Sequence, residues 1–536
     1  MLKILSLQDF EAPLFDELAT ASVTRDGTVF CTKDERVRES QSLSPHLREF
    51  PTVHIVPDML AVRETSRTVG ASDLFLPVQD SALKKVVNTW REKGVLEAIK
   101  TAAVEDPREI TLPLHWLATR MVQLLEIIER GTFWSSVLPI SGSGSVADVA
   151  ATRDWETALI RCITWHPQCI RLAVATRDDR IRIFSAPSSN IGTAVLRHSA
   201  QKSVCCMSWR PNAGRELAAA CQGGVLVWTV ELGAASNSLS HAFMLKYRSH
   251  APVTSVSWNP EGDLLVSCSL TDMNMIIWDV AKESGVPLRR VGGGGLCFTR
   301  WSSCGSRLLA TTCRKIFRVW NTETGSPWKT ERWTVPSGRV AAACFGPNLT
   351  LLFTSTEDPA MIFSLPLQEQ IFNVKKAGSS DDNKVAVPLI DLSKVVFTCD
   401  EDDARIVVGG RVVSMDWDST GRYLAIIFQD SPFVALFKTK IGSISRITEV
   451  KPLCFVKGFP GEVPSCIQFY QNYQKKLDFA VLTIAWSSGF IQNFPIMDDA
   501  KVDTQQDHCR SGVMSNTFTI ADDLQTSLYS SFSLIQ

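Results

Sequence analysis

The chain has 536 residues, of which 45% are apolar and 21% are charged, and its formal net charge at pH 7 is −1. This composition is typical of globular proteins and excludes a largely disordered chain. A net charge so close to zero provides no overall attraction to nucleic acid or to an anionic membrane, so a partner must be recognised by shape and local chemistry.

The N-terminal segment, residues 1–79, is mixed in composition. Asp9 and Glu11 occur too early for a secretory signal peptide. The run 2–7 is apolar enough to form a short strand, and we expect it to complete a sheet built by later residues, because open sheet edges invite mispairing.

Residues 80–131 have a helical period. Two series of apolar residues are spaced by three and four positions and predict two amphipathic helices on either side of Glu105-Asp106-Pro107. We expect their apolar faces to pack on the rest of the protein or on each other. The alternative is that this α-helical insert is a docking surface, with Trp90 as a candidate partner contact. The two series are Leu83, Val86, Val87, Trp90 and Leu114, Leu117, Met121, Leu124, Leu125, Ile128.

Residues 140–498 contain a repeat of 40 to 50 residues, which is typical of an array of similar sheets. Each repeat has a bulky aromatic residue where the innermost strand is expected to end. Seven such markers predict an all-β fold, a seven-bladed WD-repeat β-propeller, with the run 2–7 as the candidate closing strand. The markers are Trp165, Trp209, Trp258, Trp301, Phe345, Trp417 and Phe469.

The third repeat, from His250 to Asp279, carries the most complete pattern. Its His250, Asp272 and Trp278, with a strand hydroxyl such as Ser267 or Ser269, are the residue types that form one hydrogen-bonded chain inside a blade. Each bond satisfies a polar group that would otherwise be buried unpaired, at a cost of roughly 1–3 kcal/mol. We therefore assign these residues a structural role, and we expect the other, less complete blades to depend more on apolar packing.

The long step between the fifth and sixth markers contains an acidic insertion at about 375–412, whose charged ends are expected to form solvated loops around strand-forming residues. The tail, residues 499–536, is polar and is predicted to be flexible. Between the third and fourth repeats, Gly292–Gly295 is interpreted as a turn that permits close backbone approach.

Signatures of chemistry are largely lacking in the sequence. It has no GxxxxGK[ST] phosphate loop, HExxH zinc helix or GxSxG elbow, and the inner-strand positions are mostly apolar or small. His166 is interpreted as a surface turn residue, since no Cys or carboxylate lies at metal-ligand spacing from it. We expect no catalytic residue, metal or cofactor, and hence no enzyme.

The cysteines and the apolar runs indicate a cellular setting. The 15 cysteines include no CxxC pair, and several occur in apolar strand runs, which is typical of reduced thiols in an intracellular protein. No stretch of about 18 uncharged apolar residues is present, so association with a membrane is expected to be indirect.

The segment 327–335 interleaves basic and aromatic residues. Trp328 and Trp333 are five positions apart, so they are expected on opposite faces of an outer strand, one packed and the other available as a candidate partner contact. Base stacking is the alternative for such a pattern, but protein contact is favoured and no direct nucleic-acid binding is expected.

Several longer stretches resemble the aladin family of WD-repeat nucleoporins, over about residues 80–495. The similarity is carried by NTWREKG at 88–94, by WHP at 165–167, by the third repeat at 256–280, by 286–320 with its four glycines, by 331–339, by 389–393 and by 485–489. The tail departs from the vertebrate members of the family, whose C-terminal tail is rich in proline, because residues 498–536 contain no proline.

The resemblance implies a non-enzymatic component of the nuclear pore complex. It implies that a transmembrane nucleoporin of the pore-membrane ring holds the protein at the nuclear envelope, with other nucleoporins as further partners. It also implies support of selective protein import and a role at spindle poles in mitosis. The alternative function is a soluble WD-repeat adaptor of a ubiquitin ligase or a chromatin complex.

Overall fold

The computed structural model describes most of residues 146–496 and separate parts of the preceding chain. Within 146–496 the residues left undescribed are 187–193, 231–239, 289–293, 324–327, 368–385, 399–404, 443–446, 460 and 472–478. Before residue 146 the described residues are 4–9, 21–23, 29–31, 47, 49–57, 60, 86–87, 98–99, 102–103 and 116–121. The tail 499–536, the acidic clusters of the insertion and Trp90 lie outside the described residues.

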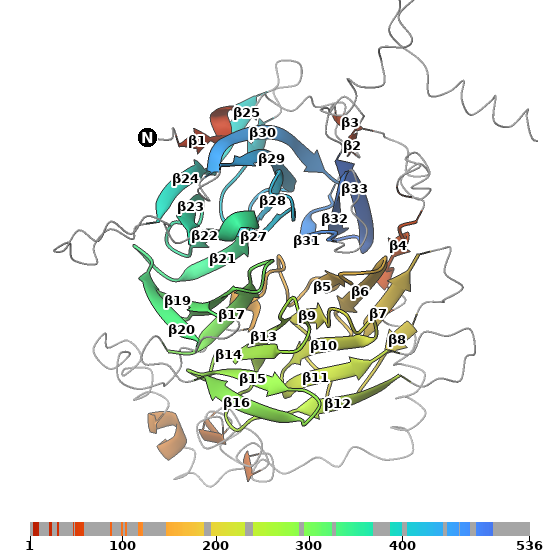
Figure 1. Ribbon diagram of the computed structural model, residues 1–536, viewed down its shortest axis with the longest axis vertical. Coiled ribbons are helices and arrows are strands. Elements are labelled where there is room, and N and C mark those ends of the chain that lie inside the picture. Colours follow the sequence, from red (N-terminus) through yellow and green to blue (C-terminus); the bar gives the residue numbers. More distant parts are fainter. Residues whose placement is uncertain are drawn as a thin grey trace, which may run out of the picture.

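Seven sheets, antiparallel except where β1 (Leu5–Ser6) joins blade five, stand around a common axis, in chain order, as blades of a propeller (Figure 1). This confirms the predicted fold class. Blade one contains β5 (Ile160–Trp165), β6 (Arg171–Thr176), β7 (Ile181–Ser185) and β8 (Ala194–Leu196), and blade two contains β9 (Cys206–Trp209), β10 (Glu216–Cys221), β11 (Gly224–Thr229) and β12 (His241–Leu245). Blade three contains β13 (Val253–Trp258), β14 (Leu265–Ser269), β15 (Met275–Asp279) and β16 (Ser284–Leu288). Blade four contains β17 (Leu296–Trp301), β18 (Arg307–Thr312), β19 (Ile316–Asn321) and β20 (Lys329–Thr334).

The last three blades follow the same plan, and blades five and seven also include a strand from the N-terminal segment. They are blade five, with β21 (Val340–Phe345), β22 (Thr350–Ser355), β23 (Met361–Pro366), β24 (Val387–Asp391) and β1 (Leu5–Ser6); blade six, with β27 (Val412–Trp417), β28 (Tyr423–Phe428), β29 (Phe433–Ile441) and β30 (Ile447–Lys457); and blade seven, with β31 (Pro464–Phe469), β32 (Ala480–Trp486), β33 (Phe490–Ile496) and β4 (Val53–His54). All seven marker aromatics are the last residues of the inner strands, as the repeat predicts.

The ring is closed by a different strand from the expected one. In blade seven, Val53 and His54 of β4 pair with Ile491 and Phe490 of β33, so β4 is the outer strand that joins the two ends of the chain. The run 2–7 lies elsewhere, since its β1 pairs in parallel with β24 at the outer edge of blade five. Both strands cover an edge, but only β4 closes the circle.

The acidic insertion is shorter than predicted, because part of it belongs to a blade. β24 lies within the range 375–412 but forms the fourth strand of blade five, paired with β23. After it, β25 (Val395–Thr398) and β26 (Arg405–Val408) form a separate two-stranded sheet. A similar pair near the N-terminus is formed by β2 (Ala21–Val23) and β3 (Val29–Cys31), beside β33 in Figure 1.

The predicted helical insert, residues 80–131, is described only at 86–87, 98–99, 102–103 and 116–121, and all of these residues are helical. Ala98 and Ala118 are buried, whereas Leu117 of the expected apolar face is 53% exposed. No helix among the described residues has the length and apolar character needed to span a membrane.

The core is divided among the seams between blades. The described residues form seven apolar clusters, and each contains side chains from two neighbouring blades. The cluster between blades seven and one also takes in Phe50, Val53 and Ile55 of the N-terminal segment. Burial of apolar area therefore joins each sheet to the next and draws the closing strand into place.

Candidate functional site: the central channel

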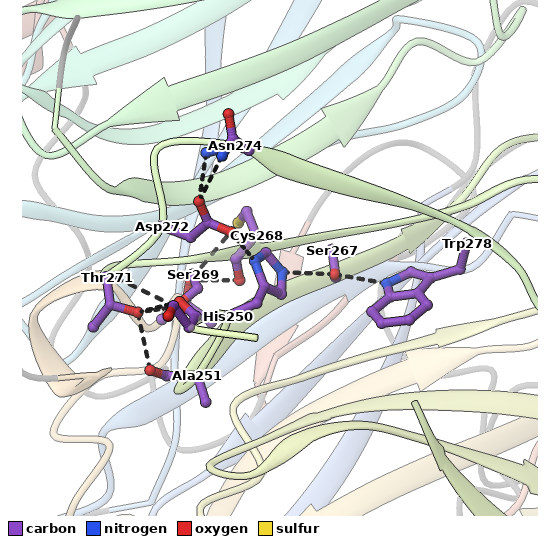
Figure 2. Close-up of polar contacts among 11 residues, drawn as sticks. His250, Ala251, Ser267, Cys268, Ser269, Thr271, Asp272, Asn274 and Trp278 are labelled. Atoms are coloured by element: carbon purple, nitrogen blue, oxygen red, sulfur yellow. Dashed lines mark hydrogen bonds and ion pairs between the residues drawn. The ribbon is translucent and has the colours of Figure 1, made fainter. Parts of the chain in front are cut away.

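The four residues singled out in the third repeat meet inside blade three (Figure 2). The His250 ring lies between two partners, with Nδ1 2.9 Å from Asp272 Oδ2 and Nε2 2.8 Å from Ser267 Oγ. The indole Nε1 of Trp278 donates to the same Oγ at 2.8 Å. An ionised carboxylate only accepts hydrogen bonds, so the imidazole proton is on Nδ1 and Nε2 accepts from the serine hydroxyl.

This chain of bonds has the properties of a structural element. His250 is 2% exposed and Trp278 is 1% exposed, so no reactant can reach them from solvent. Burial acts to raise the pKa of Asp272, but hydrogen bonds from His250 and Asn274 outweigh it, and the pKa lies below its ordinary value. The carboxylate therefore remains charged and holds the imidazole in one orientation.

Other blades replace this chain with simpler polar pairs, in addition to apolar packing. In blade two, Trp228 Nε1 donates to Gln201 Oε1 at 2.9 Å, with Gln201 in the connection that precedes β9. In blade six, the marker on the inner strand is used instead of the counterpart of Trp278: Trp417 Nε1 donates to Thr439 Oγ1 at 3.0 Å.

Two positions noted in the sequence have clear structural explanations. A Cβ on Gly295 would lie 1.6 Å from the carbonyl oxygen of Leu270, so the glycine permits the close backbone approach expected of this turn. His166 is 1% exposed, which corrects its interpretation as a surface residue. Burial, with a smaller effect from Arg171, lowers its pKa to about 4, so this imidazole is neutral at pH 7.

The two tryptophans proposed as partner contacts pack on opposite sides of blade four. Trp333 is 9% exposed and stacks on Phe317 with ring centroids 6.4 Å apart, within the seam to blade five. Trp328 packs edge-to-face on Trp301 at 6.0 Å, against the seam to blade three. The strand faces are as expected, but Trp333 is too buried to serve as a contact surface.

A candidate functional feature that sequence reasoning missed lies along the axis of the propeller. The residue immediately before each marker lines one cavity of about 350 Å³ in the channel. We call these residues the channel ring: Thr164, Ser208, Ser257, Arg300, Cys344, Asp416 and Gln468. The signal was available in the sequence, since each member is found by stepping back one residue from a marker.

Several members of the channel ring connect neighbouring blades. Ser208 Oγ accepts the backbone N–H of Trp258 at 3.1 Å, and Gln468 Oε1 accepts that of Trp165 at 3.1 Å. Asp416 Oδ2 accepts the backbone N–H of Phe469 at 2.6 Å. In each case a side chain in one blade satisfies the marker residue of the next, so the ring fixes the blades around the axis.

The channel is covered at one end by residues 146–158, which include the short helix α6 (Val146–Val149). Arg339 Nη2 of blade five donates to the carbonyl of Asp148 at 2.9 Å, and Arg153 Nη1 donates to the carbonyl of Ser431 in blade six at 2.8 Å. The backbone N–H of Arg153 donates to Ser465 of blade seven at 2.9 Å. Because Ala151 and Thr152 of this segment line the cavity, the segment closes that end, and we call it the floor.

The opposite end is bordered by the turns that follow the markers, with Pro167, Pro211, Pro260, Ser303 and Pro347 among the lining residues. We call the space between this mouth and the floor the chamber. Two charged residues belong to its ring, Arg300 and Asp416, and they are exceptions to the expectation that inner-strand positions are mostly apolar or small. Burial raises the pKa of Asp416 to about 6, although the N–H of Phe469 and the charge of Arg300 act to lower it.

The described residues contain no group of three or more His, Cys, Asp or Glu side chains placed to hold a metal ion. Within the channel ring, the chamber offers hydrogen-bonding side chains and one charged group of each sign, Arg300 and Asp416. Such an arrangement is suited to recognition of a side chain or a small polar group.

The fold and the channel define the class of this protein as a seven-bladed β-propeller of the WD-repeat type. Residues 141–497 match the family described as the aladin seven-bladed propeller, and the chain belongs to this family.

Among curated proteins, the chain is 25% identical over 329 residues to Aladin of Arabidopsis thaliana, which covers 56% of this chain and 68% of the relative. It is also 24% identical over 161 residues to WD repeat and HMG-box DNA-binding protein 1 of Mus musculus, which covers 29% of this chain and 14% of that protein. Among solved structures, the β-propeller domain of Myceliophteria thermophila Cps50 (Swd1) aligns with a TM-score of 0.44 at 17% identity, over 63% of this chain and 98% of that one.

Proposed function

We propose that this protein is a non-enzymatic interaction scaffold of the nuclear pore complex. The observation that carries the proposal is the match of residues 141–497 to the aladin propeller family, together with the resemblance of longer stretches to WD-repeat nucleoporins. The polar side chains of blade three are used within the fold, as a scaffold requires.

The construction of the propeller supports a scaffold role. The closed ring of sheets, with apolar packing at each seam, provides a rigid body. The outer strand β20 presents polar side chains to solvent, and five of its six residues are exposed. Rigid elements that carry exposed loops and strand edges are well suited to holding several partners at once.

The proposal includes an anchor and a task. A transmembrane nucleoporin of the pore-membrane ring holds the protein at the nuclear envelope, and other nucleoporins contact its remaining surfaces. In this position it supports import of selected proteins, and in mitosis it acts at spindle poles.

The test is the position of a fluorescently tagged full-length chain in interphase cells, with and without depletion of individual transmembrane nucleoporins. A punctate nuclear rim that is lost when one of them is depleted supports the anchored nucleoporin. A diffuse signal under all conditions overturns it and favours the soluble adaptor of a ubiquitin ligase or chromatin complex.

A second experiment locates the docking surface. Deletion of residues 80–131 should release the protein from the rim, provided that limited proteolysis shows the propeller still folded. Continued rim localisation of the deletion variant would place the docking surface on the propeller.

A further inference from the structure

One member of the channel ring cannot perform the task that three of its counterparts perform. Ser208, Asp416 and Gln468 accept a backbone N–H from the next blade. Arg300 occupies the same position in blade four, but a guanidinium has only donors and cannot accept the N–H of a marker. Its presence in the ring therefore calls for a different explanation.

No carboxylate side chain in the described part of the chain forms an ion pair with Arg300. Its guanidinium is 5.9 Å from the centre of the Phe298 ring, and no ion pair within 4 Å joins it to a described carboxylate. Asp416 is the other charged member of the ring, two blades away, with Cys344 of blade five between them in the ring order. The charges of Arg300 and Asp416 act in opposite directions on the pKa of Cys344. The two groups share one space but do not meet.

We propose that the chamber binds an acidic side chain, aspartate or glutamate, of a partner polypeptide, with Arg300 as its ion-pair partner. The side chain enters through the mouth formed by the marker turns, because residues 151–152 close the other end. The proposal deepens the scaffold function by naming the chemistry of a partner. Binding by purified protein is measured independently of where the protein resides in the cell.

Size and charge favour a carboxylate over other anions. The planar guanidinium matches a carboxylate in a bidentate pair, and the cavity of about 350 Å³ has room for one extended side chain and part of its backbone. A phosphate dianion would double the attraction to Arg300, but it would also double the repulsion from the two lining carboxylates, Asp416 and Asp418. The chamber therefore favours a singly charged group.

The same arrangement predicts that binding depends on pH. With its pKa raised to about 6, Asp416 loses its charge as the pH falls from 7.5 to 5.5, whereas a glutamate in the ligand stays ionised. Loss of that charge removes the repulsion, so affinity should increase several-fold. The other ionisable groups that line the chamber are Asp418 and the thiols of Cys162, Cys205, Cys206, Cys344 and Cys466.

The test uses the full-length protein and labelled heptapeptides of glycine and serine with one central Glu, Gln or phosphoserine. Fluorescence polarisation should show saturable binding of the Glu peptide, and the Gln peptide should bind at least about tenfold more weakly. Arg300→Gln should weaken binding of the Glu peptide by about the same factor. Arg332→Gln, on exposed strand β20, is the matched control and should leave binding unchanged.

Two further variants keep the proposal testable if Arg300→Gln fails to fold. Ser303 is exposed at the mouth, and Ser303→Trp should block entry while Arg300 remains in place. Asp416→Asn should bind the Glu peptide equally well at pH 7.5 and pH 5.5. Equal binding of the Glu and Gln peptides, preference for phosphoserine, or lack of saturable binding would each overturn the proposal.

Discussion

Blade three and blade seven use hydrogen bonds for different purposes. In blade three, the chain Asp272–His250–Ser267–Trp278 lies within residues 250–279 and stiffens one sheet. In blade seven, Thr483 Oγ1 accepts from Trp165 Nε1 of blade one at 2.8 Å and donates to Asn493 Oδ1 at 2.9 Å. Asn493 Nδ2 then donates to the carbonyl of Pro51 at 3.4 Å.

The comparison shows that similar polar chemistry serves a local and a global need. A blade made from consecutive residues is already held in register by its own turns, so its buried polar chain can be internal. A blade assembled from both ends of the chain has no such connection. Its polar chain instead links blade one, blade seven and the N-terminal segment, where the ring would otherwise open.

The largest expected effect comes from breaking the closure at Gly489. This residue has φ of +88°, and a Cβ would lie 2.0 Å from the carbonyl oxygen of Ile55, next to β4. Gly489→Ala should push β4 away and cost about 3 kcal/mol or more, measured as a lower midpoint of urea-induced unfolding.

A matched control separates the clash from the backbone conformation. Gly461 also lies in blade seven's part of the chain, with φ of +85°, but nothing lies within 4 Å of a Cβ there. Gly461→Ala should cost only about 1 kcal/mol. Similar losses in both variants would show that the contact between Gly489 and Ile55 does not hold the ring closed.

The next effect concerns the internal chain of blade three. Asp272→Ala leaves the buried Nδ1–H of His250 without its acceptor and should cost about 2–4 kcal/mol in unfolding free energy. Trp278 substitutions should act in the same direction. Asp279, the Asp of the Trp-Asp pair, is the control: its side chain is 43% exposed and pairs with Lys282, so Asp279→Ala should leave the unfolding midpoint unchanged.

The third prediction contrasts two histidines through the pH dependence of stability. His250 has partners at both ring nitrogens, whereas Nε2 of His166 is buried without a hydrogen bond among the described residues. With a folded pKa of about 4, His166 stays neutral while the unfolded chain takes up a proton below about pH 6.5. Its contribution to stability is therefore lost as the pH falls through this window, by up to about 3 kcal/mol.

The contribution of Asp416 to the pH dependence of stability has the opposite sign. Its folded pKa of about 6 lies above its unfolded value, so the folded state gains stability from this group as the pH falls from 6 to 4. Urea unfolding at pH 7 and pH 4.5 measures how much unfolding free energy is lost on acidification. Compared with wild type, His166→Gln should lose less and Asp416→Asn should lose more. Parallel profiles for the three proteins would contradict both assignments.

The smallest effect comes from transferring part of the blade three chain to blade four. Trp320 Nε1 is buried without a hydrogen bond among the described residues. Leu308 pairs with Trp320 as Leu265 pairs with Trp278, so Ala310 occupies the position that Ser267 has in blade three. Ala310→Ser should supply an acceptor and gain up to about 1 kcal/mol, whereas Ser267→Ala should cost about 1–3 kcal/mol. A loss of stability in Ala310→Ser would show that the site cannot hold the hydroxyl.

The blades and part of the candidate site could be predicted from local sequence. Each marker ends an inner strand because a bulky aromatic before a turn fills the space between neighbouring sheets, and this pattern recurs in every repeat. The residues of the blade three chain could be named because their spacing is set within one blade. The channel ring was also accessible in principle, since its members precede the markers.

Other features depended on contacts between distant residues. Val53–His54 has no strand period of its own and becomes a strand only because β33 has a free edge and an apolar seam beside it. The floor of the chamber likewise forms because Arg153 and Asp148 meet groups from three blades. The burial of Trp333 is decided by Phe317 on the neighbouring strand.

The sequence by itself determined the number of blades, the ends of the inner strands and the polar chain of blade three, because period, turn residues and side-chain chemistry act over a few tens of residues. Tertiary structure alone decided which strand closes the ring, which end of the channel is covered, and that Arg300 and Asp416 share one chamber. These outcomes depend on burial and on donors and acceptors contributed by residues far apart in the chain, which no local pattern records.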